Sequence, residues 1–335
     1  MNLFLTTGEA IVENSAANKP FNIVILDGGT TNPGDITFEP IENLGNVTFY
    51  EDTPKELVYE RSKDADAIII NRIVVTRELL LSLPKLKYIG LFATGFNLVD
   101  TKAAHELGVT VCNVPFYCVG TVAQQAFALL LELCNHVNNL SDTIKNGNYN
   151  HSIEMSLSEY PIFELYGKTL GIVGYGNIGK TVAALGKALS MNILVYSKHE
   201  KKLEDGERQV SLEELFSKSD VISLHCALND ETRELVNERL LSLVKPTALL
   251  INTARGGLID EKALANALNS GKIGGAGLDV LAKEPPEKDC PLFTAKNVVL
   301  TPHIGWSSRD ARMRLVKCVA DNLSAWLDKK PINVV

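Results

Sequence analysis

The chain has few cysteines, and none belongs to a recognisable pair or cluster. Its 335 residues contain no C-x-x-C motif and no grouping of cysteine with histidine that would suit a metal ion. Neither a disulfide framework nor a metal site is therefore expected. We interpret the cysteines as reduced, mostly buried thiols of a cytoplasmic protein. They stand at positions 112, 118, 134, 226, 290 and 318.

Long hydrophobic runs and an excess of positive charge are also missing. No apolar stretch reaches the roughly 18 residues that a membrane helix needs, and the start, MNLFLTTGEA, lacks the features of a signal peptide. A net charge of −7 argues against nucleic acid or an anionic membrane as partner. With 45% hydrophobic and 22% charged residues, the chain is expected to be globular, and its length predicts two domains.

Short β-branched runs alternate with helical stretches in two series, which is typical of βαβ units around a parallel sheet. The sequence thus predicts an α/β fold of two Rossmann-like or flavodoxin-like parallel-sheet domains, the larger inserted into the smaller. The first series of strands is expected at 22–27, 46–50, 66–70, 86–92 and 109–113. The second is expected at 169–174, 192–196, 221–225, 247–252, 275–280 and 297–302.

Two helices are expected to connect the domains. Apolar residues recur at steps of three or four from Val122 to Ile144, which predicts one long helix ended by Gly147. The last helix is expected to begin with a capping box at Ser307-x-x-Asp310 and to return to the first domain. The predicted boundaries are 1–119 with 305–335 for a substrate-binding domain, and 120–304 for a nucleotide-binding domain. Ala311, Leu315, Val319, Leu323 and Leu327 are expected on one face of the last helix.

The segment TLGIVGYGNIGKTVAALGKAL carries the pattern G-x-G-x-x-G between a strand and a helix. Gly174 permits a tight turn, Gly176 lets backbone amides approach a pyrophosphate, and Gly179 allows helix and strand to pack closely. Because the strand, the spacing and the helix are all present, we interpret this segment as a dinucleotide site rather than an ordinary glycine turn.

The identity of the dinucleotide is less clear from the residues. An NAD site usually has an acidic residue at the end of the next strand, where this chain has Ser197. Lys198, Lys201 and Lys202 follow and could meet a 2′-phosphate, although Lys201 and Lys202 also fit a solvated charge run. NAD(H) and NADP(H) both stay open.

Four polar residues stand at or shortly after the ends of the later strands: Arg255, Asp279, Glu284 and His303. Taken singly, each has an ordinary structural explanation. Ligands of open α/β sheets, however, bind outside the carboxyl ends of the strands, so all four are expected to face one crevice. Arginine offers a planar fork to a carboxylate, and histidine can donate a proton while a carboxylate orients it. This pattern indicates reduction of a carbonyl next to a carboxylate.

At this point the chain resembles the family of D-isomer-specific 2-hydroxyacid dehydrogenases, over nearly its whole length from Asn22. The resemblance is carried by LPKLKYIGLFATGFNLVD, ELYGKTLGIVGYGNIG, LLINTARGGLIDEKAL, GAGLDVLAKEPP and LTPHIGW. Within the family, ATGFNLVD, VCNVP and HIGWSSRDAR are most similar to the glycerate dehydrogenase (hydroxypyruvate reductase) and glyoxylate reductase branch. The resemblance implies closure of two lobes over the substrate and a homodimer built around the cofactor domain.

The resemblance also implies roles for individual residues. Arg255 would bind and polarise a 2-oxo acid, His303 would be the acid and base, and Glu284 its partner. Backbone amides at Thr94 and Gly95 would hold the substrate carboxylate. Contacts with the cofactor would come from Asn177 and Ile178 at the pyrophosphate, Thr253 and Asp279 at the nicotinamide, and Thr121 in the linking helix. Trp306 could narrow the pocket toward a two- or three-carbon acid, or could serve domain packing.

Departures from the family pattern leave alternatives open. Ser197 in place of an acid puts strict NAD use in doubt, and Glu284 in place of glutamine argues against formate dehydrogenases. Other possible substrates are D-lactate, a branched 2-oxo acid or phosphoglycerate, although the regulatory domain that many phosphoglycerate dehydrogenases add is not expected here. A dinucleotide-sensing protein resembling the C-terminal-binding-protein corepressors is the remaining alternative. Such proteins usually carry extended tails, which are not expected here.

Overall fold

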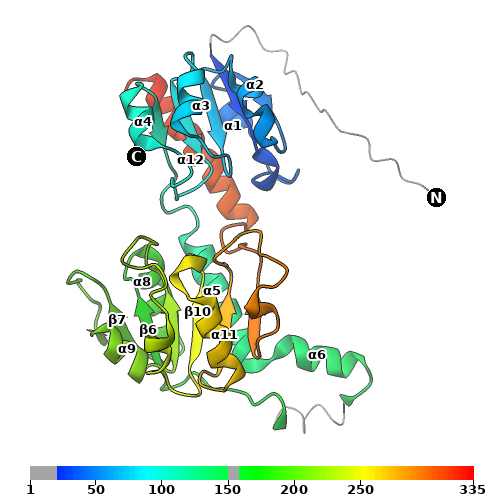
Figure 1. The fold of residues 1–335 in the computed structure, drawn as a ribbon, viewed down its shortest axis with the longest axis vertical. Helices are drawn as coiled ribbons and strands as arrows, with labels where there is room; N and C mark the ends of the chain where they lie inside the picture. Colours follow the sequence, from blue (N-terminus) through cyan, green and yellow to red (C-terminus); the bar gives the residue numbers. More distant parts are fainter. Residues whose placement is uncertain (1–20, 150–157) are drawn as a thin grey trace. The chain divides into compact units, whose positions relative to one another are not determined.

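The computed structural model describes residues 21–149 and 158–335, which form two compact units with one parallel sheet each (Figure 1). Unit 1 comprises the described residues up to 117 together with Ser307–Val335, and unit 2 comprises those described between 118 and 306. The larger unit is therefore inserted into the smaller one, as the predicted fold class requires. The division lies two residues from each predicted boundary, at 117 against 119 and at 306 against 304. The role of unit 1 in substrate binding stays a prediction.

Unit 1 is a five-stranded sheet in the order β2-β1-β3-β4-β5, which is the flavodoxin-like order. Its central strands are buried on both faces, as expected when helices cover both sides of a parallel sheet. The strands are β1 (Asn22–Ile25), β2 (Asn46–Phe49), β3 (Ala67–Ile70), β4 (Tyr88–Leu91) and β5 (Thr110–Cys112). The helices are α1 (Glu39–Glu42), α2 (Val58–Ser62), α3 (Arg77–Ser82), α4 (Thr101–Glu106) and α12 (Arg309–Leu327).

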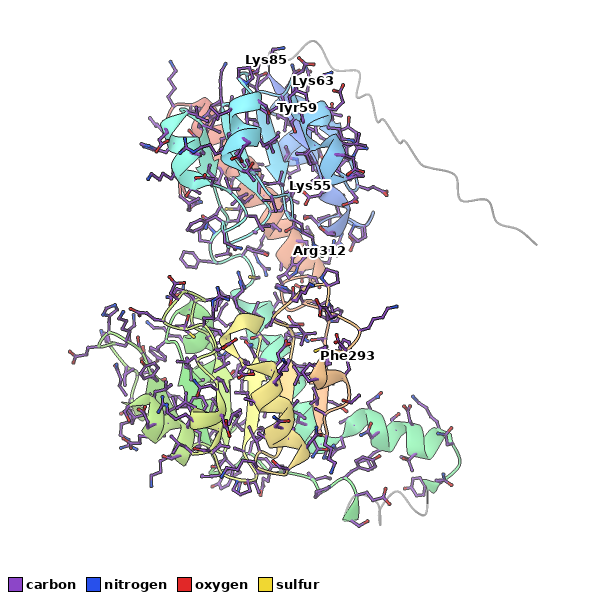
Figure 2. All side chains as sticks on the ribbon, in the orientation of Figure 1. Lys55, Tyr59, Lys63, Lys85, Phe293 and Arg312 are labelled. Atoms are coloured by element: carbon purple, nitrogen blue, oxygen red, sulfur yellow. The ribbon has the colours of Figure 1, made fainter. Side chains whose placement is uncertain are left out.

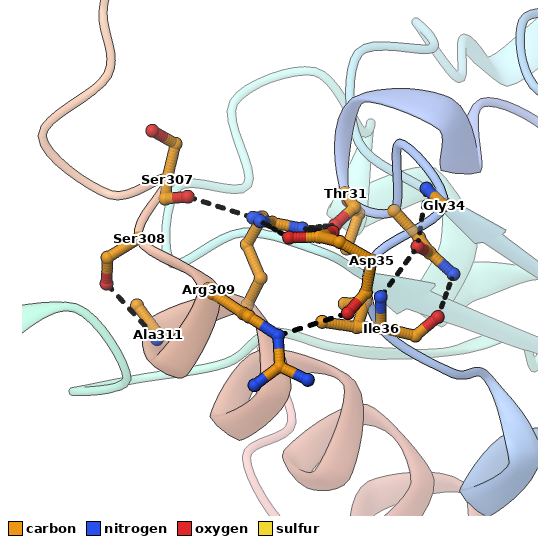
Figure 3. A network of polar contacts seen from close by, with 10 residues as sticks. Thr31, Gly34, Asp35, Ile36, Ser307, Ser308, Arg309 and Ala311 are labelled. Atoms are coloured by element: carbon orange, nitrogen blue, oxygen red, sulfur yellow. Dashed lines mark hydrogen bonds and ion pairs between the residues drawn. The ribbon is translucent and has the colours of Figure 1, made fainter.

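Helix α12 returns the chain to unit 1, and Arg312 anchors it there (Figure 2). The Arg312 guanidinium donates two parallel hydrogen bonds of 2.7 Å to the Asp35 carboxylate and one of 3.1 Å to the carbonyl of Thr31 (Figure 3). This paired geometry offsets the cost of an arginine that is only 7% exposed. The hydrogen bonds tie the start of α12 to the loop that follows β1.

The start of α12 differs from the predicted capping box by one residue. Ser308, not Ser307, is the N-cap, and its hydroxyl accepts a hydrogen bond from the amide of Ala311. The reciprocal contact from Asp310 would require Ser307 to take the cap position, and Ser307 instead offers its carbonyl to Arg312. The predicted apolar face is correct at its first four positions, whereas Leu327 is 37% exposed at the end of the helix.

Unit 2 is a seven-stranded sheet in the order β12-β11-β10-β9-β6-β7-β8. Read from the other edge, this is the Rossmann order with one added strand, and the order reverses between β6 and β9. The edge strand β8 was not predicted because its three residues are polar. The strands are β6 (Thr169–Val173), β7 (Asn192–Tyr196), β8 (Glu207–Gln209), β9 (Val221–Leu224), β10 (Leu249–Asn252), β11 (Gly275–Leu278) and β12 (Val298–Leu300). The longer helices are α5 (Val119–Asn135), α6 (Val137–Lys145), α8 (Asn177–Ala188), α9 (Leu212–Lys218) and α11 (Glu261–Asn269).

The predicted single helix from Val122 to Ile144 was wrong, because the structure has two helices. The chain breaks at His136, which takes a left-handed conformation with φ of 49° and serves as the C-cap of α5. The first half packs on the sheet through Ala126, Leu129 and Leu133, whereas α6 has no buried residue. The apolar period therefore continues past the point where unit 2 offers a surface to cover it. Gly147, with φ of 82°, follows α6 as predicted.

Two further expectations concern the chain as a whole. None of the six cysteines, all of which lie in the described part of the chain, forms a disulfide; three are buried and three partly buried. Among the described residues, no helix has both the length and the apolar character needed to cross a bilayer.

Candidate active site

The candidate site of unit 2 lies where the carboxyl ends of its parallel strands meet. Gly174 follows β6, Ser197 follows β7, Arg255 lies three residues after β10, Asp279 directly follows β11, and His303 lies three residues after β12. In-register pairing of neighbouring strands brings these ends to one edge of the sheet. The site therefore surrounds the point where the strand order reverses, which is the usual ligand crevice of this architecture.

The glycine loop is shaped to leave backbone amides open to an anion. Gly174 has φ of 97°, and a Cβ there would lie 2.6 Å from the amide nitrogen of Cys226. A Cβ at Gly179 would lie 2.2 Å from the carbonyl oxygen of Gly174, so both positions exclude a side chain. At Gly176, in contrast, a Cβ would meet no atom within 4 Å, and the N-terminus of α8 has no side-chain cap. The loop thus fits a pyrophosphate above Gly176, near Asn177 and Ile178.

His303 and Glu284 lie within hydrogen-bond distance of each other. Nδ1 of His303 is 2.7 Å from Oε2 of Glu284, while Oε1 of Glu284 accepts a hydrogen bond of 3.0 Å from the amide of Leu281. Burial tends to raise the pKa of Glu284, but the hydrogen bonds from His303 and Leu281 and the charge of Arg255 outweigh it, so the pKa lies below 4.5. The Glu284 carboxylate is therefore ionised at neutral pH. Because it contacts Nδ1 of His303, Nε2 is the ring nitrogen that can face a substrate.

Asp279 holds the loop that carries His303. Its Oδ1 accepts hydrogen bonds from the Thr301 hydroxyl at 2.6 Å and the Ile304 amide at 3.0 Å. Its Oδ2 accepts a hydrogen bond of 2.8 Å from the Gly305 amide. The Asp279 carbonyl accepts a hydrogen bond of 2.7 Å from the amide of His303, whose φ is 55°. Both carboxylate oxygens are thus engaged with protein groups, and the predicted contact with a nicotinamide stays a prediction.

Arg255 is exposed on a loop that Asn252 fixes. The buried Asn252 side chain accepts a hydrogen bond from the amide of Ala254 and donates one of 2.9 Å to the carbonyl of Arg255. The two glycines after Arg255 were expected to keep its approach uncrowded. The structure gives Gly256 another role, because a Cβ there would lie 1.9 Å from the backbone carbon of Leu281. Gly256 therefore lets the loop of Arg255 pack against the loop of Glu284.

The other predicted site residues are placed as follows. Thr253 directly follows β10 and is buried, and its hydroxyl has no hydrogen-bond partner within the described part of the chain, so its predicted contact with the cofactor stays a prediction. Thr121 lies in the first turn of α5, and Trp306 is the last residue of unit 2. Thr94 and Gly95 follow β4 in unit 1, where Asn113 donates a hydrogen bond of 2.7 Å to the carbonyl of Thr94.

Lys198 and Ser197, which were expected near the ribose, both contact other protein groups. Lys198 is exposed, and its ammonium forms an ion pair with both carboxylate oxygens of Glu231, at 2.6 and 2.8 Å. This contact could not be predicted from the sequence, because its partners are 33 residues apart. The backbone carbonyl of Ser197 accepts a hydrogen bond of 3.1 Å from the side chain of Gln209.

Sequence reasoning missed His225, which directly follows β9 beside the glycine loop. Its ring Nε2 lies 2.8 Å from the Ser223 hydroxyl, and its amide donates a hydrogen bond of 2.7 Å to the carbonyl of Val173. Burial lowers the pKa of His225 from 6.5 to about 3, so its ring is neutral at physiological pH. The signal in the sequence that could have identified His225 is a histidine at the end of a predicted strand.

No group of three or more histidine, cysteine or acidic side chains suited to a metal occurs within residues 21–149 and 158–335.

The chain is similar to known proteins over most of its length. Residues 127–305 match the family described as D-isomer specific 2-hydroxyacid dehydrogenase, NAD binding domain. The chain is 41% identical to a hydroxypyruvate reductase from Blautia hydrogenotrophica, over 93% of this chain and 99% of the relative. It is 40% identical to a glycerate dehydrogenase from Methylorubrum extorquens, over 84% and 89%. A solved acyclic imino acid reductase in complex with NADPH and D-arginine superposes with a TM-score of 0.84 at 33% identity, covering 94% of this chain and 99% of that one.

Proposed function

Because the chain belongs to the family of D-isomer-specific 2-hydroxyacid dehydrogenases, which are NAD(P)-dependent oxidoreductases, we propose that it reduces hydroxypyruvate or glyoxylate to the corresponding 2-hydroxy acid. The two relatives described above, named for hydroxypyruvate and glycerate, support this substrate class. Glyoxylate reductases from Thermococcus litoralis and Pyrococcus furiosus are 38% and 39% identical to the chain.

The observation that carries the proposal is the hydrogen-bonded pair of His303 and Glu284 beside the charge of Arg255. Arg255 binds the substrate carboxylate and polarises the neighbouring carbonyl, because a guanidinium presents two parallel donors. His303 donates a proton from Nε2 to the carbonyl oxygen as that oxygen gains negative charge. Ionised Glu284 keeps the imidazole oriented and stabilises its protonated form. A bound nicotinamide supplies the hydride.

The remaining contacts of the substrate are proposed on the predicted residues. Backbone amides at Thr94 and Gly95 hold the carboxylate, and Trp306 limits the length of the acid. The hydrogen bonds from Asn113 to the Thr94 carbonyl and from the Thr94 hydroxyl to Val114 fix the backbone that bears these amides, which supports the assignment. A bulky aromatic side chain three residues after His303 favours acids of two or three carbons.

The cofactor is proposed to lie along the glycine loop and to be accepted with or without a 2′-phosphate. The open face at Gly176 supports a contact with the pyrophosphate, and the position of Thr253 directly after β10 supports a contact with the nicotinamide end. Ser197 places no carboxylate directly after β7, and Lys198, although paired with Glu231, offers a positive charge next to it. Both features favour use of NADH and NADPH together over strict use of NADH.

We also propose that two copies of the chain associate through helix α6. None of the nine residues of this helix is buried within the chain, and Val137 and Ile144 are 62% and 45% exposed. Apolar side chains held in a regular helix outside the core favour a partner surface. Analytical ultracentrifugation should give twice the monomer mass of 36.6 kDa, whereas a monomer at micromolar concentration would contradict the arrangement. The six cysteines form no disulfide, which supports a reducing compartment, and we propose the cytoplasm.

A substrate panel tests the proposed activity. Hydroxypyruvate, glyoxylate, pyruvate, a branched 2-oxo acid and 3-phosphohydroxypyruvate are each to be reduced with NADH and with NADPH, and kcat/KM compared. We expect the largest values with hydroxypyruvate or glyoxylate. A higher value with a branched or phosphorylated acid would reject the proposed substrate while leaving the reaction type in place. Absence of turnover with every acid and both cofactors would reject the activity.

A further inference from the structure

The loop after β7 has one fixed path, which the side chain of Gln209 determines. The Gln209 Nε2 donates hydrogen bonds of 3.1 Å to the carbonyls of Ser197 and His199, and its Oε1 accepts one of 3.0 Å from the amide of Lys201. One amide side chain thus holds three backbone groups of the segment that includes Lys198. The Lys198 ammonium is accordingly presented from a defined backbone position.

A second set of contacts joins the glycine loop to β8, the strand that also carries Gln209. Tyr175, between the first two glycines of the pattern, donates a hydrogen bond from its hydroxyl to Oε2 of Glu207 on β8. Lys187 on α8 forms an ion pair of 2.9 Å with Oε1 of Glu207, whose side chain is only 2% exposed. The glycine loop, helix α8 and strand β8 are therefore connected through one buried carboxylate. The position of the Lys198 loop relative to the glycine loop is fixed in this way.

The ion pair between Lys198 and Glu231 spans the end of the central strand. Lys198 follows β7 and Glu231 lies in the loop after β9, and both strands are direct neighbours of β6. Glu231 is held on a turn in which Asn229 Oδ1 accepts hydrogen bonds of 3.0 and 3.1 Å from the amides of Glu231 and Thr232. Since the glycine loop follows β6, the pair crosses the side of the crevice where the adenosine half of a dinucleotide binds.

We propose that Glu231 is a specificity-determining residue that competes with the 2′-phosphate of NADP(H) for Lys198. With NAD(H) bound, the ion pair between the two side chains stays intact. With NADP(H) bound, the ammonium turns to the phosphate, and the carboxylate is left unpaired beside a second negative group. Glu231 therefore weakens the binding of NADPH without a comparable effect on the binding of NADH. This inference rests on the proposed function, because it needs a dinucleotide along the glycine loop.

The size of the expected change in affinity follows from the solvent exposure of Lys198 and Glu231. The side chains of Lys198 and Glu231 are 65% and 66% exposed, and exposed ion pairs of this kind contribute little. Releasing Lys198 from its competitor should consequently raise the affinity for a 2′-phosphate by about threefold to fivefold at low salt. The effect should shrink as ionic strength rises, because both charges are open to solvent.

The test measures the binding of two nucleotide fragments, 2′,5′-ADP and 5′-ADP, by calorimetry with the intact protein. Glu231→Gln should tighten 2′,5′-ADP by about threefold to fivefold and leave 5′-ADP unchanged. Glu213→Gln is the matched control, because Glu213 forms a similarly exposed ion pair of 3.0 Å with Arg239 elsewhere in unit 2. This control should alter neither affinity. An equal change for both fragments in Glu231→Gln, or no change, would overturn the proposal.

A second variant establishes that the effect acts through the lysine. Lys198→Met should weaken the binding of 2′,5′-ADP and spare that of 5′-ADP, and adding Glu231→Gln to it should bring a smaller gain than Glu231→Gln brings alone. If Glu231→Gln tightens the binding of 2′,5′-ADP by the same factor without the lysine, competition for Lys198 is wrong. If the unaltered protein binds none of the four ligands, 2′,5′-ADP, 5′-ADP, NADH and NADPH, then the nucleotide site itself and the proposed function fail together.

Discussion

Nδ1 of His303 lies 2.7 Å from Oε2 of Glu284, although the two residues come from the loops after different strands, β12 and β11. The carboxylate is held in turn by the amide of Leu281, so its orientation does not depend on the histidine alone. Asp279 fixes the backbone on the other side of the imidazole through the amides of Ile304 and Gly305. The ring is thus oriented by two carboxylates, one on its side chain and one on its loop.

Replacing His303 by alanine should lower kcat for reduction by about 10² or more, because the proton donor is lost. Binding of NADH, followed by its fluorescence, should be unchanged, since none of the glycine-loop contacts involves His303. Steady-state kinetics with hydroxypyruvate or glyoxylate measures the first effect. Undiminished turnover in the variant would remove His303 from the mechanism.

The lowered pKa of Glu284 makes a prediction about acid pH. Because the folded pKa of Glu284 lies below 4.5, its carboxylate stays ionised as the pH falls from 7 to 5 and continues to orient the imidazole of His303. The kcat/KM for reduction should therefore show no decline across this interval. The measurement is a pH profile for the wild type and for Glu284→Gln. An acid decline with a midpoint above 4.5 that disappears in the variant would show that Glu284 titrates higher than the structure indicates.

Arg255→Lys should raise KM for the 2-oxo acid at least about tenfold, since an ammonium cannot donate two parallel hydrogen bonds to a carboxylate. The affinity for NADH should not change. Initial rates over a range of substrate concentrations give KM and kcat separately. An unaltered KM would assign the arginine a structural role.

The sequence located the strand ends well, because parallel pairing places them at one edge whatever the details of packing. Arg255, Glu284 and His303 could be selected on that ground, and the fold class was confirmed. Contacts between distant loops were not accessible in the same way. The pairing of Lys198 with Glu231 depends on the path of two surface loops. The break at His136 depends on where the core ends, which the apolar period of the helix does not reveal.

Gly256→Ala tests whether the loops of Arg255 and Glu284 must touch. A Cβ at this position would lie 1.9 Å from backbone atoms, which cannot move aside as a flexible side chain does, so we expect a lower melting temperature and a large loss of kcat/KM. Gly120→Ala is a matched control for stability, because a Cβ there meets no atom within 4 Å and the residue lies in helix α5. Its melting temperature should be equal or higher. Equal melting temperatures of Gly256→Ala and the wild type would contradict the close approach.

His225 predicts how folding stability depends on pH. Its pKa is lowered to about 3 in the folded protein by burial, whereas in the unfolded chain it stays near 6.5. Between these values the unfolded state binds the additional proton, so the contribution of His225 to the free energy of unfolding is fully present above pH 6.5 and is lost as the pH falls toward 3. His225→Asn removes the titrating group and can keep a hydrogen bond to Ser223. Urea unfolding at pH 7, 6 and 5 should therefore show a shallower decline in the variant than in the wild type. Parallel declines would mean that the ring is solvated enough to titrate normally, and that the wall of the glycine loop is more open than the contacts of His225 indicate.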